Sequence, residues 1–477
     1  MIGWLILLAL AAFIAVLLFR TLRFTPLPEA SASTHPVDVD EAKAIRDLQA
    51  LIRCKTVSYR DKSLEDDNEF ACLEALLPEM FPNVHRVCDF HKPDPRALLF
   101  HWKGKHADKP GVLMAHYDVV PVDEAAWDKP PFEAIIEDGV MWGRGTIDTK
   151  TTFLAVLEAA DALIARGFVP ENDLYLAFGG DEEISGGGAP SIVRWLKEHD
   201  VTPAFVLDEG GAVVEKVFPG VTQPCALIGI GEKGPLDVKL VLEGAGGHSS
   251  TPPPRTAVGR LAKAVTRIEA NPFPFTLTPP AAQLFDTLGR RSTFLYRMVF
   301  ANLWCFKPVL NVFCRLSGGE LNALVRTTVA FTQMQGSAAS NVLPPSAWVG
   351  ANLRLIGDET VESARAYLQK TAGDPAIRVE VMHGMNPSPV SRTDDEPYAR
   401  LASAIRATWT DAVVSPYLML ACSDSRHYAA ISDHVYRFSP MALSKEEWGM
   451  IHANNERIPL ETVTKAVAFY QRIIQAC

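Results

Sequence analysis

The segment LYLAFGGDEEISGGG, residues 174–188, joins an apolar run to acidic residues that stand among glycines. The apolar run followed by glycines predicts a buried β-strand that ends where the acidic residues begin. Taken alone, the adjacent Glu182 and Glu183 suit a solvated surface loop, which is the usual place for a run of charges. A functional site is the better interpretation if other polar residues converge on the same place.

Three further apolar runs between about residues 110 and 210 lead into polar residues in the same manner. Short apolar runs that alternate with helical patterns are typical of βαβ units and a parallel sheet. The carboxyl ends of neighbouring parallel strands share one crevice, so these polar side chains are expected to meet there. The residues that follow the runs are His116, Asp118, Asp148, Asp208 and Glu209.

Such a group of residues predicts a metal site. Each residue alone has an ordinary explanation, since an aspartate before a helix is usually an N-cap. Several carboxylates in one cleft, however, repel one another unless a cation neutralises them. Imidazole and carboxylate are the ligands expected of Zn²⁺, with Mn²⁺ or Co²⁺ as substitutes. Because there are four or five such ligands, the sequence favours two metal ions.

Length and composition restrict the class of protein. With 477 residues and 48% hydrophobic content, the chain can build a large core and two or three domains of about 150 residues each. Its net charge of −10 argues against a nucleic-acid partner and favours small substrates. The eight cysteines form no C-x-x-C pair, which supports neither a disulfide scaffold nor a thiolate zinc site.

The N-terminus predicts a membrane anchor. Residues 2–19 carry no charge and would form a helix of about 27 Å, just short of the ~30 Å hydrocarbon core. We expect a transmembrane anchor over residues 1–23 and a flexible tether over 24–37. A cleaved signal peptide is the alternative, although no Lys or Arg precedes the apolar run. Arg20 and Arg23 favour a cytoplasmic main body, but two charges leave the membrane face open.

A series of motifs resembles a known family. The chain resembles the cocatalytic zinc peptidases and amidohydrolases that include aminoacylase, carboxypeptidase G and carboxypeptidase S. The segments NALVRTT and PPFEAIIEDGVMWGRGT look most like the carboxypeptidase S branch, which includes enzymes that act on N-fatty-acyl amino acids. The matching motifs, in family order over roughly residues 50–470, are HYDVVP, GRGTIDTK, GGDEE, LDEGG, GHSSTPP, NVLPPSAWVGANLR and GMIHANNE.

The resemblance implies an α/β, zinc-exopeptidase-like fold with a mixed, mainly parallel sheet and flanking helices. The catalytic domain would comprise residues 38–233 and 358–477. An inserted α+β lid domain, which is usually also a dimerisation surface, would occupy residues 234–357. The chain would then act as a homodimer through this domain.

The resemblance also implies roles for individual residues around two zinc ions per chain. One zinc would be held by His116 and Asp208 and the other by Glu183 and His452, with Asp148 bridging them. Asp118 would orient His116. Glu182 would be the general base that acts on a metal-activated water. The bridging aspartate is expected to precede a cis peptide bond to Thr149.

Three further residues are implied to act on the substrate. His248 would stabilise the oxyanion, often from the partner subunit, while Asn341 and Arg354 would contact the substrate. An arginine suits bidentate binding of a carboxylate. Judged from the residues alone, a turn histidine is the better interpretation of His248, and a charge on a strand surface is the better interpretation of Arg354. Ser423 stands where the family commonly has threonine, a departure that concerns substrate fit.

The resulting prediction is a membrane-anchored zinc metallohydrolase that cleaves an amide bond next to a free carboxylate. Its substrate would be a peptide, as for a carboxypeptidase, or an N-acyl amino acid. One alternative is a catalytically inactive, membrane-anchored binding protein on the same fold, although such a protein has no chemical use for Glu182 beside intact ligands. Another is an aminopeptidase or dipeptidase. An aminopeptidase would need an acidic residue for the substrate amine, whereas Arg354 favours a carboxylate.

The stretch FLYRMVFANLWCFKPVLNVF, residues 294–313, is more apolar than a one-sided surface helix requires. Three interpretations stay open for it. It can be buried in the lid core or in a subunit interface, it can contact a membrane, or it can form an acyl-chain groove that leads to the zinc site.

Overall fold

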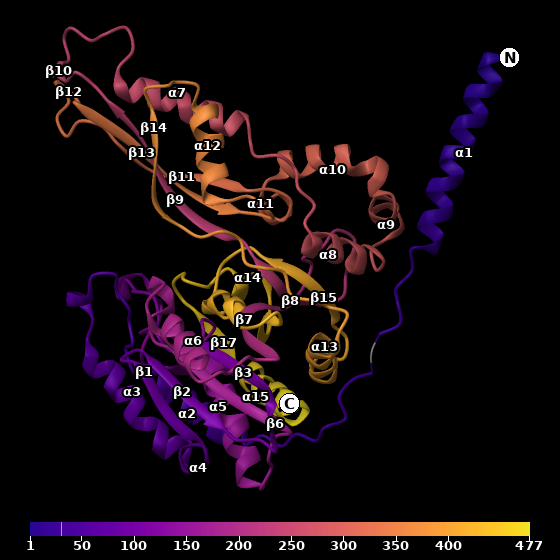
Figure 1. Ribbon diagram of the computed structural model, residues 1–477, viewed down its shortest axis with the longest axis vertical. Helices are drawn as coiled ribbons and strands as arrows, with labels where there is room; N and C mark the ends of the chain where they lie inside the picture. The colour runs from indigo at the N-terminus through magenta and orange to yellow at the C-terminus, as the bar shows by residue number, and fades with distance from the viewer. Residues whose placement is uncertain (30) are drawn as a thin grey trace.

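The computed structural model describes residues 1–29 and 31–477. A mixed eight-stranded sheet forms the centre of the larger body, in the order β1-β2-β6-β3-β7-β16-β8-β15 (Figure 1). Its middle strands β6, β3, β7 and β16 are parallel, while β1 and β2 form an antiparallel edge. The strands are β1 (Asp89–Asp94), β2 (Ala97–Trp102), β3 (His106–His116), β6 (Asn172–Gly179), β7 (Phe205–Val214), β8 (Cys225–Glu232), β15 (Val413–Met419) and β16 (Val435–Leu443).

Helices cover both faces of this sheet because both faces of its strands are apolar. On β2, Leu98 and Phe100 belong to one core cluster, whereas Ala97 and Leu99 belong to the cluster on the opposite face, as the two-residue period of a strand requires. The first face carries α2 (Glu41–Arg53), α5 (Lys150–Ala165) and α15 (Leu460–Ala476). The second face carries α6 (Gly188–Glu198). The expected mixed α/β sheet with flanking helices is therefore confirmed.

Smaller elements complete the larger body. Its remaining helices are α3 (Asp67–Met80), α4 (Pro82–Val87), α13 (Glu396–Thr408) and α14 (Lys445–Trp448). Its 3-10 helices are η1 (Lys62–Leu64), η2 (Glu124–Ala126), η3 (Glu182–Ile184) and η4 (Asp424–Ala430). A separate three-stranded sheet consists of β4 (Ile135–Glu137), β5 (Val140–Trp142) and β17 (Arg457–Pro459).

A second, antiparallel sheet stands apart from the first, with the order β11-β13-β9-β14 (Figure 1). It packs against α7 (Ala257–Ala270) and α12 (Val361–Ala372) around its own apolar core. Its strands are β9 (Gly234–Glu243), β11 (Thr328–Gln335), β13 (Ser346–Leu355) and β14 (Arg378–Gly384). Both α12 and β14 follow residue 357, where the inserted segment was expected to end. At the far tip, β10 (Gly247–His248) pairs with β12 (Val342–Leu343).

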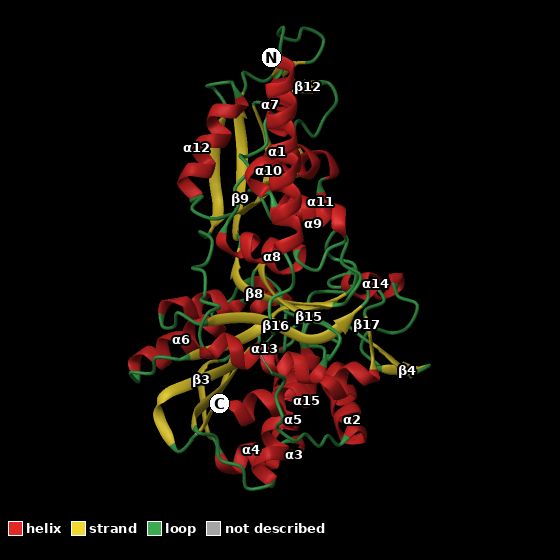
Figure 2. Ribbon diagram, turned by 90° about the vertical axis from the view of Figure 1, so that its right-hand side faces the viewer, coloured by secondary structure: helices red, strands yellow, loops and turns green. Residues whose placement is uncertain are grey.

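Four helices lie between the two sheets and the N-terminal helix. They are α8 (Pro279–Gly289), α9 (Phe294–Ala301), α10 (Leu303–Ser317) and α11 (Gly319–Ala323). The N-terminal helix α1 (Ile2–Arg23) projects from the body beside α9 and α10 (Figure 2). Its mean hydropathy is 2.9 over an 18-residue window that is only 6% buried. These properties suit a membrane anchor and equally a signal sequence.

Candidate metal centre and active site

The polar residues after the strands converge at one end of the main sheet. His116 is the last residue of β3, and Glu182 and Glu183 begin the 3-10 helix directly after β6. Asp148 lies two residues before the start of α5. Because β3 lies between β6 and β7 in the sheet, the carboxyl ends of these strands open on the same crevice.

Asp148 joins two histidines that are far apart in the sequence. Its Oδ1 lies 3.0 Å from His116 Nε2, and its Oδ2 lies 3.0 Å from His452 Nε2. His452 Nε2 is also 3.0 Å from Glu183 Oε2. Each carboxylate oxygen of Asp148 therefore faces a different histidine, so this one side chain contacts both halves of the cluster. The Asp148–Thr149 peptide bond is cis, which confirms the prediction for it.

Asp118 braces both His116 and the loop of the two glutamates. His116 Nδ1 lies 3.3 Å from Asp118 Oδ1 and 3.0 Å from the Asp118 carbonyl oxygen. The same carboxylate accepts hydrogen bonds from the backbone N–H groups of Glu182 at 3.1 Å and Glu183 at 3.2 Å. The Ser58 hydroxyl donates a further bond at 2.6 Å. Asp118 thus fixes the orientation of the ring and the start of the acidic loop together.

The glycines of the acidic loop make room for its third acid, Asp181. The Asp181 carboxylate accepts hydrogen bonds from the N–H groups of Gly187 and Gly188. A Cβ at Gly186 would lie 2.0 Å from Asp181 Oδ2, and one at Gly188 would lie 2.5 Å from Oδ1. Residues with side chains would therefore displace Asp181 and open the turn that carries Glu182 and Glu183.

The structure places Glu209, rather than Asp208, within reach of His116. Glu209 Oε1 lies 3.4 Å from His116 Nε2, whereas Asp208 Oδ2 accepts a hydrogen bond from the backbone N–H of Ser425 at 2.9 Å. Both residues follow the last residue of β7 that pairs with β3, Leu207. Neighbouring residues on an extended chain point in opposite directions, so the sequence shows the pair but not which member faces the histidine.

The geometry and electrostatics of this cluster fit metal ions. Glu183 Oε1 is buried and has no hydrogen-bond partner among the described residues. Burial and the neighbouring Asp148 raise the pKa of Glu183 to about 7. Burial raises the pKa of Glu209 to about 8 and the pKa of Glu182 well above its usual value. Two histidines among carboxylates of raised pKa form a ligand set that suits zinc and related divalent ions.

Two buried residues that the sequence did not single out hold the ligand loops together. The Glu456 carboxylate pairs with Arg144 Nη1 at 2.7 Å and accepts the backbone N–H groups of Ile147 at 2.6 Å and Asp148 at 3.2 Å. Arg144 also donates to the carbonyl oxygen of His452 at 3.3 Å. Arg144 lies in the motif GRGTIDTK and Glu456 in the motif GMIHANNE, so these motifs could have pointed to the two residues.

The three residues expected to act on the substrate are not all brought to the cluster. Arg354 on β13 donates from Nη1 to Cys422 Sγ at 3.1 Å, and Cys422 lines the same pocket as Asp148, Glu182 and His452. His248 and Asn341 lie instead in and beside the β10–β12 ribbon, where the Ser249 N–H donates to the Asn341 carbonyl at 3.1 Å. Figure 1 shows this ribbon at the far tip of the second sheet.

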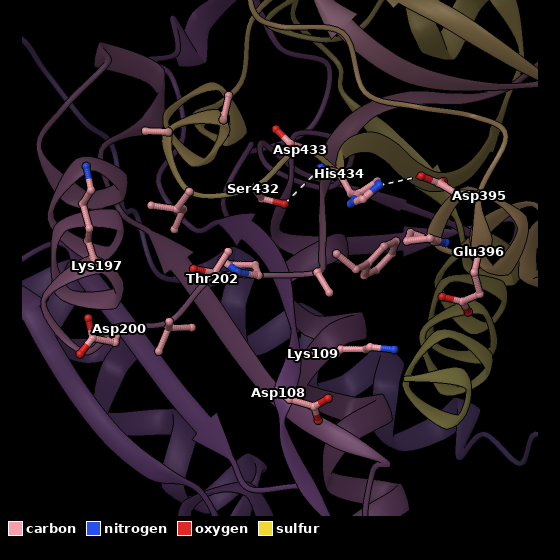
Figure 3. Close-up of a pocket in the computed structure, with 18 of the residues that line it drawn as sticks. Asp108, Lys109, Lys197, Asp200, Thr202, Asp395, Glu396, Ser432, Asp433 and His434 are labelled. Atoms are coloured by element: carbon pink, nitrogen blue, oxygen red, sulfur yellow. Dashed lines mark hydrogen bonds and ion pairs between the residues drawn. The ribbon is translucent and has the colours of Figure 1, made fainter.

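A cavity of about 930 Å³ lies at the opposite end of the strands and does not share these features. His434, just before β16, faces Asp395 at 2.7 Å, while Lys197, Asp200 and Lys109 are spread around the rim (Figure 3). Within the part of the chain that the structure describes, the groups of residues that could hold a metal both contain His116. The candidate active site is therefore the cluster at the carboxyl ends of the strands.

Comparison with known proteins extends the likeness to nearly the whole chain. The sequence profile of peptidase family M20/M25/M40 matches residues 112–476. The N-fatty-acyl-amino acid synthase/hydrolase PM20D1 of Xenopus tropicalis is 36% identical over 490 residues, which cover 98% of this chain and 93% of that protein. The probable carboxypeptidase S-like 2 of Dictyostelium discoideum is 33% identical over 98% of this chain and 92% of its own length.

Solved structures agree in fold. The M20 family metallo-carboxypeptidase Sso-CP2 from Sulfolobus solfataricus superposes with a TM-score of 0.65 at 18% identity, covering 92% of this chain and 99% of that chain. The YXEP protein of Bacillus subtilis, described as a dinuclear metal binding peptidase from the M20 family, has a TM-score of 0.56 at 11% identity and covers 91% of this chain and 98% of its own. At these identities the likeness concerns the fold.

Proposed function

The chain belongs to peptidase family M20/M25/M40, and on that premise we propose that it is a dinuclear zinc amidohydrolase that cleaves N-acyl amino acids. The observation that carries the proposal is the arrangement around Asp148, whose two oxygens each face a histidine while a separate carboxylate, Glu182, stands beside them. The family consists of enzymes that hydrolyse amide bonds, and the sequence relatives include an N-fatty-acyl-amino acid synthase/hydrolase.

The chain's own residues would hold two metal ions. Glu183 and His452 would form one site, His116 and the pair Asp208–Glu209 the other, with Asp148 shared between them. When bound, zinc would polarise the amide carbonyl of the substrate and would make a water acidic enough to be deprotonated near neutral pH. The family resemblance favours Asp208 as the carboxylate beside His116, and the 3.4 Å distance favours Glu209. The metal content of Asp208→Asn and Glu209→Gln distinguishes them, because the ligand variant loses metal and the other keeps it.

Glu182 would be the general base. Its backbone is held by Asp118, so its side chain is presented to the cluster independently of Glu183, which faces His452. In this position it can accept a proton at the reacting centre and pass it to the leaving amine. A binding protein without catalytic activity would have no need for this additional, partly buried carboxylate.

Arg354 would recognise the free carboxylate of the substrate. Its guanidinium lies against Cys422 at the pocket wall, and an arginine can bind a carboxylate through two parallel hydrogen bonds. His248 and Asn341 would complete the site either when the second sheet closes over the pocket or from the partner subunit of a homodimer. Under this proposal residues 234–384 form the lid domain and α1 anchors the protein in a membrane.

A substrate profile tests the proposal directly. The purified zinc-loaded full chain should hydrolyse N-acyl amino acids and should be at least about tenfold less active on the same compounds with the carboxylate amidated, because the charge-assisted pair with Arg354 is lost. Peptides with a free carboxyl terminus report carboxypeptidase activity, which the carboxypeptidase S-like relative favours. If only peptides with a free amino terminus are cleaved, the protein is instead an aminopeptidase. If no substrate is hydrolysed, the catalytically inactive binding protein is the hypothesis that remains.

A further inference from the structure

Helices α9 and α10 present an apolar face that the described part of the chain leaves largely exposed. Leu316 is 82% exposed and Leu295 is 70% exposed, while Leu310 and Cys314 on the opposite side of α10 are buried. Packing within the chain therefore accounts for only part of the apolar stretch. Exposed apolar patches of this kind mark sites of contact with another surface. We name this patch the docking face, and it consists of Leu295, Trp304, Val309, Val312, Phe313 and Leu316.

The docking face is joined to the N-terminal helix. Asn302, buried between α9 and α10, donates from Nδ2 to the Leu17 carbonyl and to Thr21 Oγ1, both at 3.3 Å. The Trp304 ring packs edge-on against Phe13 with 5.9 Å between the ring centroids. At about 1.5 Å per residue, Phe13 lies roughly 15 Å from the end of α1. Asn302 in the turn between α9 and α10, however, contacts Leu17 and Thr21, which lie within about 9 Å of that end, so the turn lies near the interface of a bilayer that α1 spans.

Charge around the docking face suits an anionic lipid surface. Residues 294–317 contain Arg297, Lys307 and Arg315 and no acidic residue, although the whole chain carries a net charge of −10. The last turn of α1 adds Arg20 and Arg23. Apolar faces with a basic rim bind in the interface of anionic bilayers, and tryptophan favours the same region.

A cavity lies between the docking face and the candidate active site. It has a volume of about 420 Å³ and lies beneath α10. Apolar side chains such as Leu284, Leu288 and Phe313 make up most of its wall, and the charged residues Glu215, Lys216, Glu320 and Lys445 also line it. Phe313 thus belongs both to the docking face and to the cavity wall. The catalytic pocket, of about 330 Å³, shares Glu320, Tyr417 and Trp448 with this cavity. Both volumes lie in the range of about 300–1,000 Å³ that holds small ligands.

We propose that the docking face seats on a phospholipid bilayer and that the acyl chain of a membrane-dissolved substrate passes through the cavity beneath α10 to the metal cluster. The passage rests on the proposed amidohydrolase function, whereas the docking does not. The amide bond then lies beside Glu182 while the acyl chain packs against the apolar side chains of the cavity wall, such as Leu284 and Leu288. A substrate with a short acyl group reaches the pocket without using the passage.

Fluorescence of Trp304 tests the docking without any measurement of activity. The full chain is reconstituted in vesicles of phosphatidylcholine and phosphatidylglycerol, and the signal of Trp304 is taken as the difference between wild type and Trp304→Phe. We expect lipids with brominated acyl chains to quench this signal and aqueous iodide to leave it unchanged. Quenching by iodide alone overturns the docking. Protection from both quenchers assigns the face to a second copy of the chain and overturns it as well.

A blocked passage tests the route of the acyl chain. Ser317 lines the cavity at the exposed end of α10, and its hydroxyl bonds only the carbonyl oxygen of Cys314, at 3.4 Å. For Ser317→Trp we expect kcat/KM on an N-palmitoyl amino acid to fall at least about tenfold, the loss for excluding two or more methylene groups. Hydrolysis of the N-acetyl compound should stay unchanged. Thr266→Trp is the matched control, since Thr266 is an exposed helical residue whose hydroxyl bonds the Ala262 carbonyl.

The outcomes separate this inference from the proposed function. The passage is overturned if Ser317→Trp hydrolyses the palmitoyl substrate as fast as the wild type. It is also overturned if the variant loses the same factor in kcat/KM on the palmitoyl and the acetyl substrate. In both cases the amidohydrolase function stands. No hydrolysis of any N-acyl amino acid by the wild type overturns the proposed function and the passage together. The fluorescence result then still decides whether the face docks on a bilayer.

Discussion

At the residue scale, one buried carboxylate organises most of the candidate site. Asp118 is fully buried, contacts His116, and holds the backbone of both Glu182 and Glu183. A single side chain therefore sets the distance between His116 at the end of β3 and the acidic loop after β6. The two glutamates are adjacent in sequence, but their side chains point to different partners. Glu183 faces His452, and Glu182 lies in the group around His116 and Glu209.

Replacing Glu182 by glutamine should abolish turnover and leave the metals in place. With the roles proposed above, the variant removes the base and no metal ligand, so kcat should fall by about 10²- to 10⁴-fold or more. Metal analysis of the purified variant should match the wild type. A kcat near that of the wild type would remove Glu182 from the mechanism.

Replacing Asp148 by alanine should release both metals together. Its two oxygens face His116 and His452 separately, so the variant weakens both halves of the cluster at once. Metal content should be measured by mass spectrometry after dialysis, with Asp123→Ala as the control, since Asp123 only caps an exposed 3-10 helix. Retention of the full metal content would contradict the bridging role.

At the scale of elements, the site depends on the buried ion pair that holds two loops in place. The loop before α5 carries Asp148 and the loop after α14 carries His452, and the buried pair of Arg144 and Glu456 contacts both. Neither loop is part of the main sheet. The sheet positions β3 and β6, whereas this ion pair positions the remaining two members of the cluster.

Replacing Glu456 by glutamine should destabilise the protein far more than removing a surface pair. The change leaves the Arg144 guanidinium, which is 2% exposed, without its counter-charge, and breaking a buried pair costs about 3–5 kcal/mol. The matched control is Glu446→Gln, because Glu446 is 74% exposed and its bond to Arg457 is worth about 0–1 kcal/mol.

The free energy of unfolding should be measured by denaturant titration for both variants, in the metal-free protein, so that lost metal does not enter the comparison. Equal stability of the two variants would show that the Arg144–Glu456 pair does not support the loops.

At the scale of the whole molecule, two residues that the proposed mechanism assigns to the substrate lie away from the pocket. His248 and Asn341 lie at the tip of this sheet, away from the pocket, whereas Arg354 lies at its base beside Cys422. In the proposed mechanism, one chain as it stands therefore lacks only the groups that would stabilise the oxyanion. A closing motion or a second subunit would supply them.

A mixing experiment distinguishes these two sources. His248→Ala and Glu182→Gln should each be inactive alone. If His248 acts from the partner subunit, a co-expressed mixture should regain activity, because mixed dimers pair an intact Glu182 site with an intact His248. About a quarter of the wild-type rate is expected, because random pairing makes half of the dimers mixed and each mixed dimer has one intact site of two. Random pairing is expected because an isologous interface uses the same surface on both subunits. A mixture that forms mixed dimers and stays inactive would assign His248 to its own chain.

The sequence by itself determined the chemistry of the site and the layers of the main sheet. Apolar runs that end in His116, in Glu182–Glu183 and in Asp208–Glu209 require buried strands with polar carboxyl ends, and the period of the side chains follows from local backbone geometry. The tertiary structure decided which member of a neighbouring pair faces inward, as Glu209 does beside His116. It also brought Arg144 and Glu456 together and placed α10 beside α1. Such contacts join residues hundreds of positions apart, and they depend on packing that no local pattern encodes.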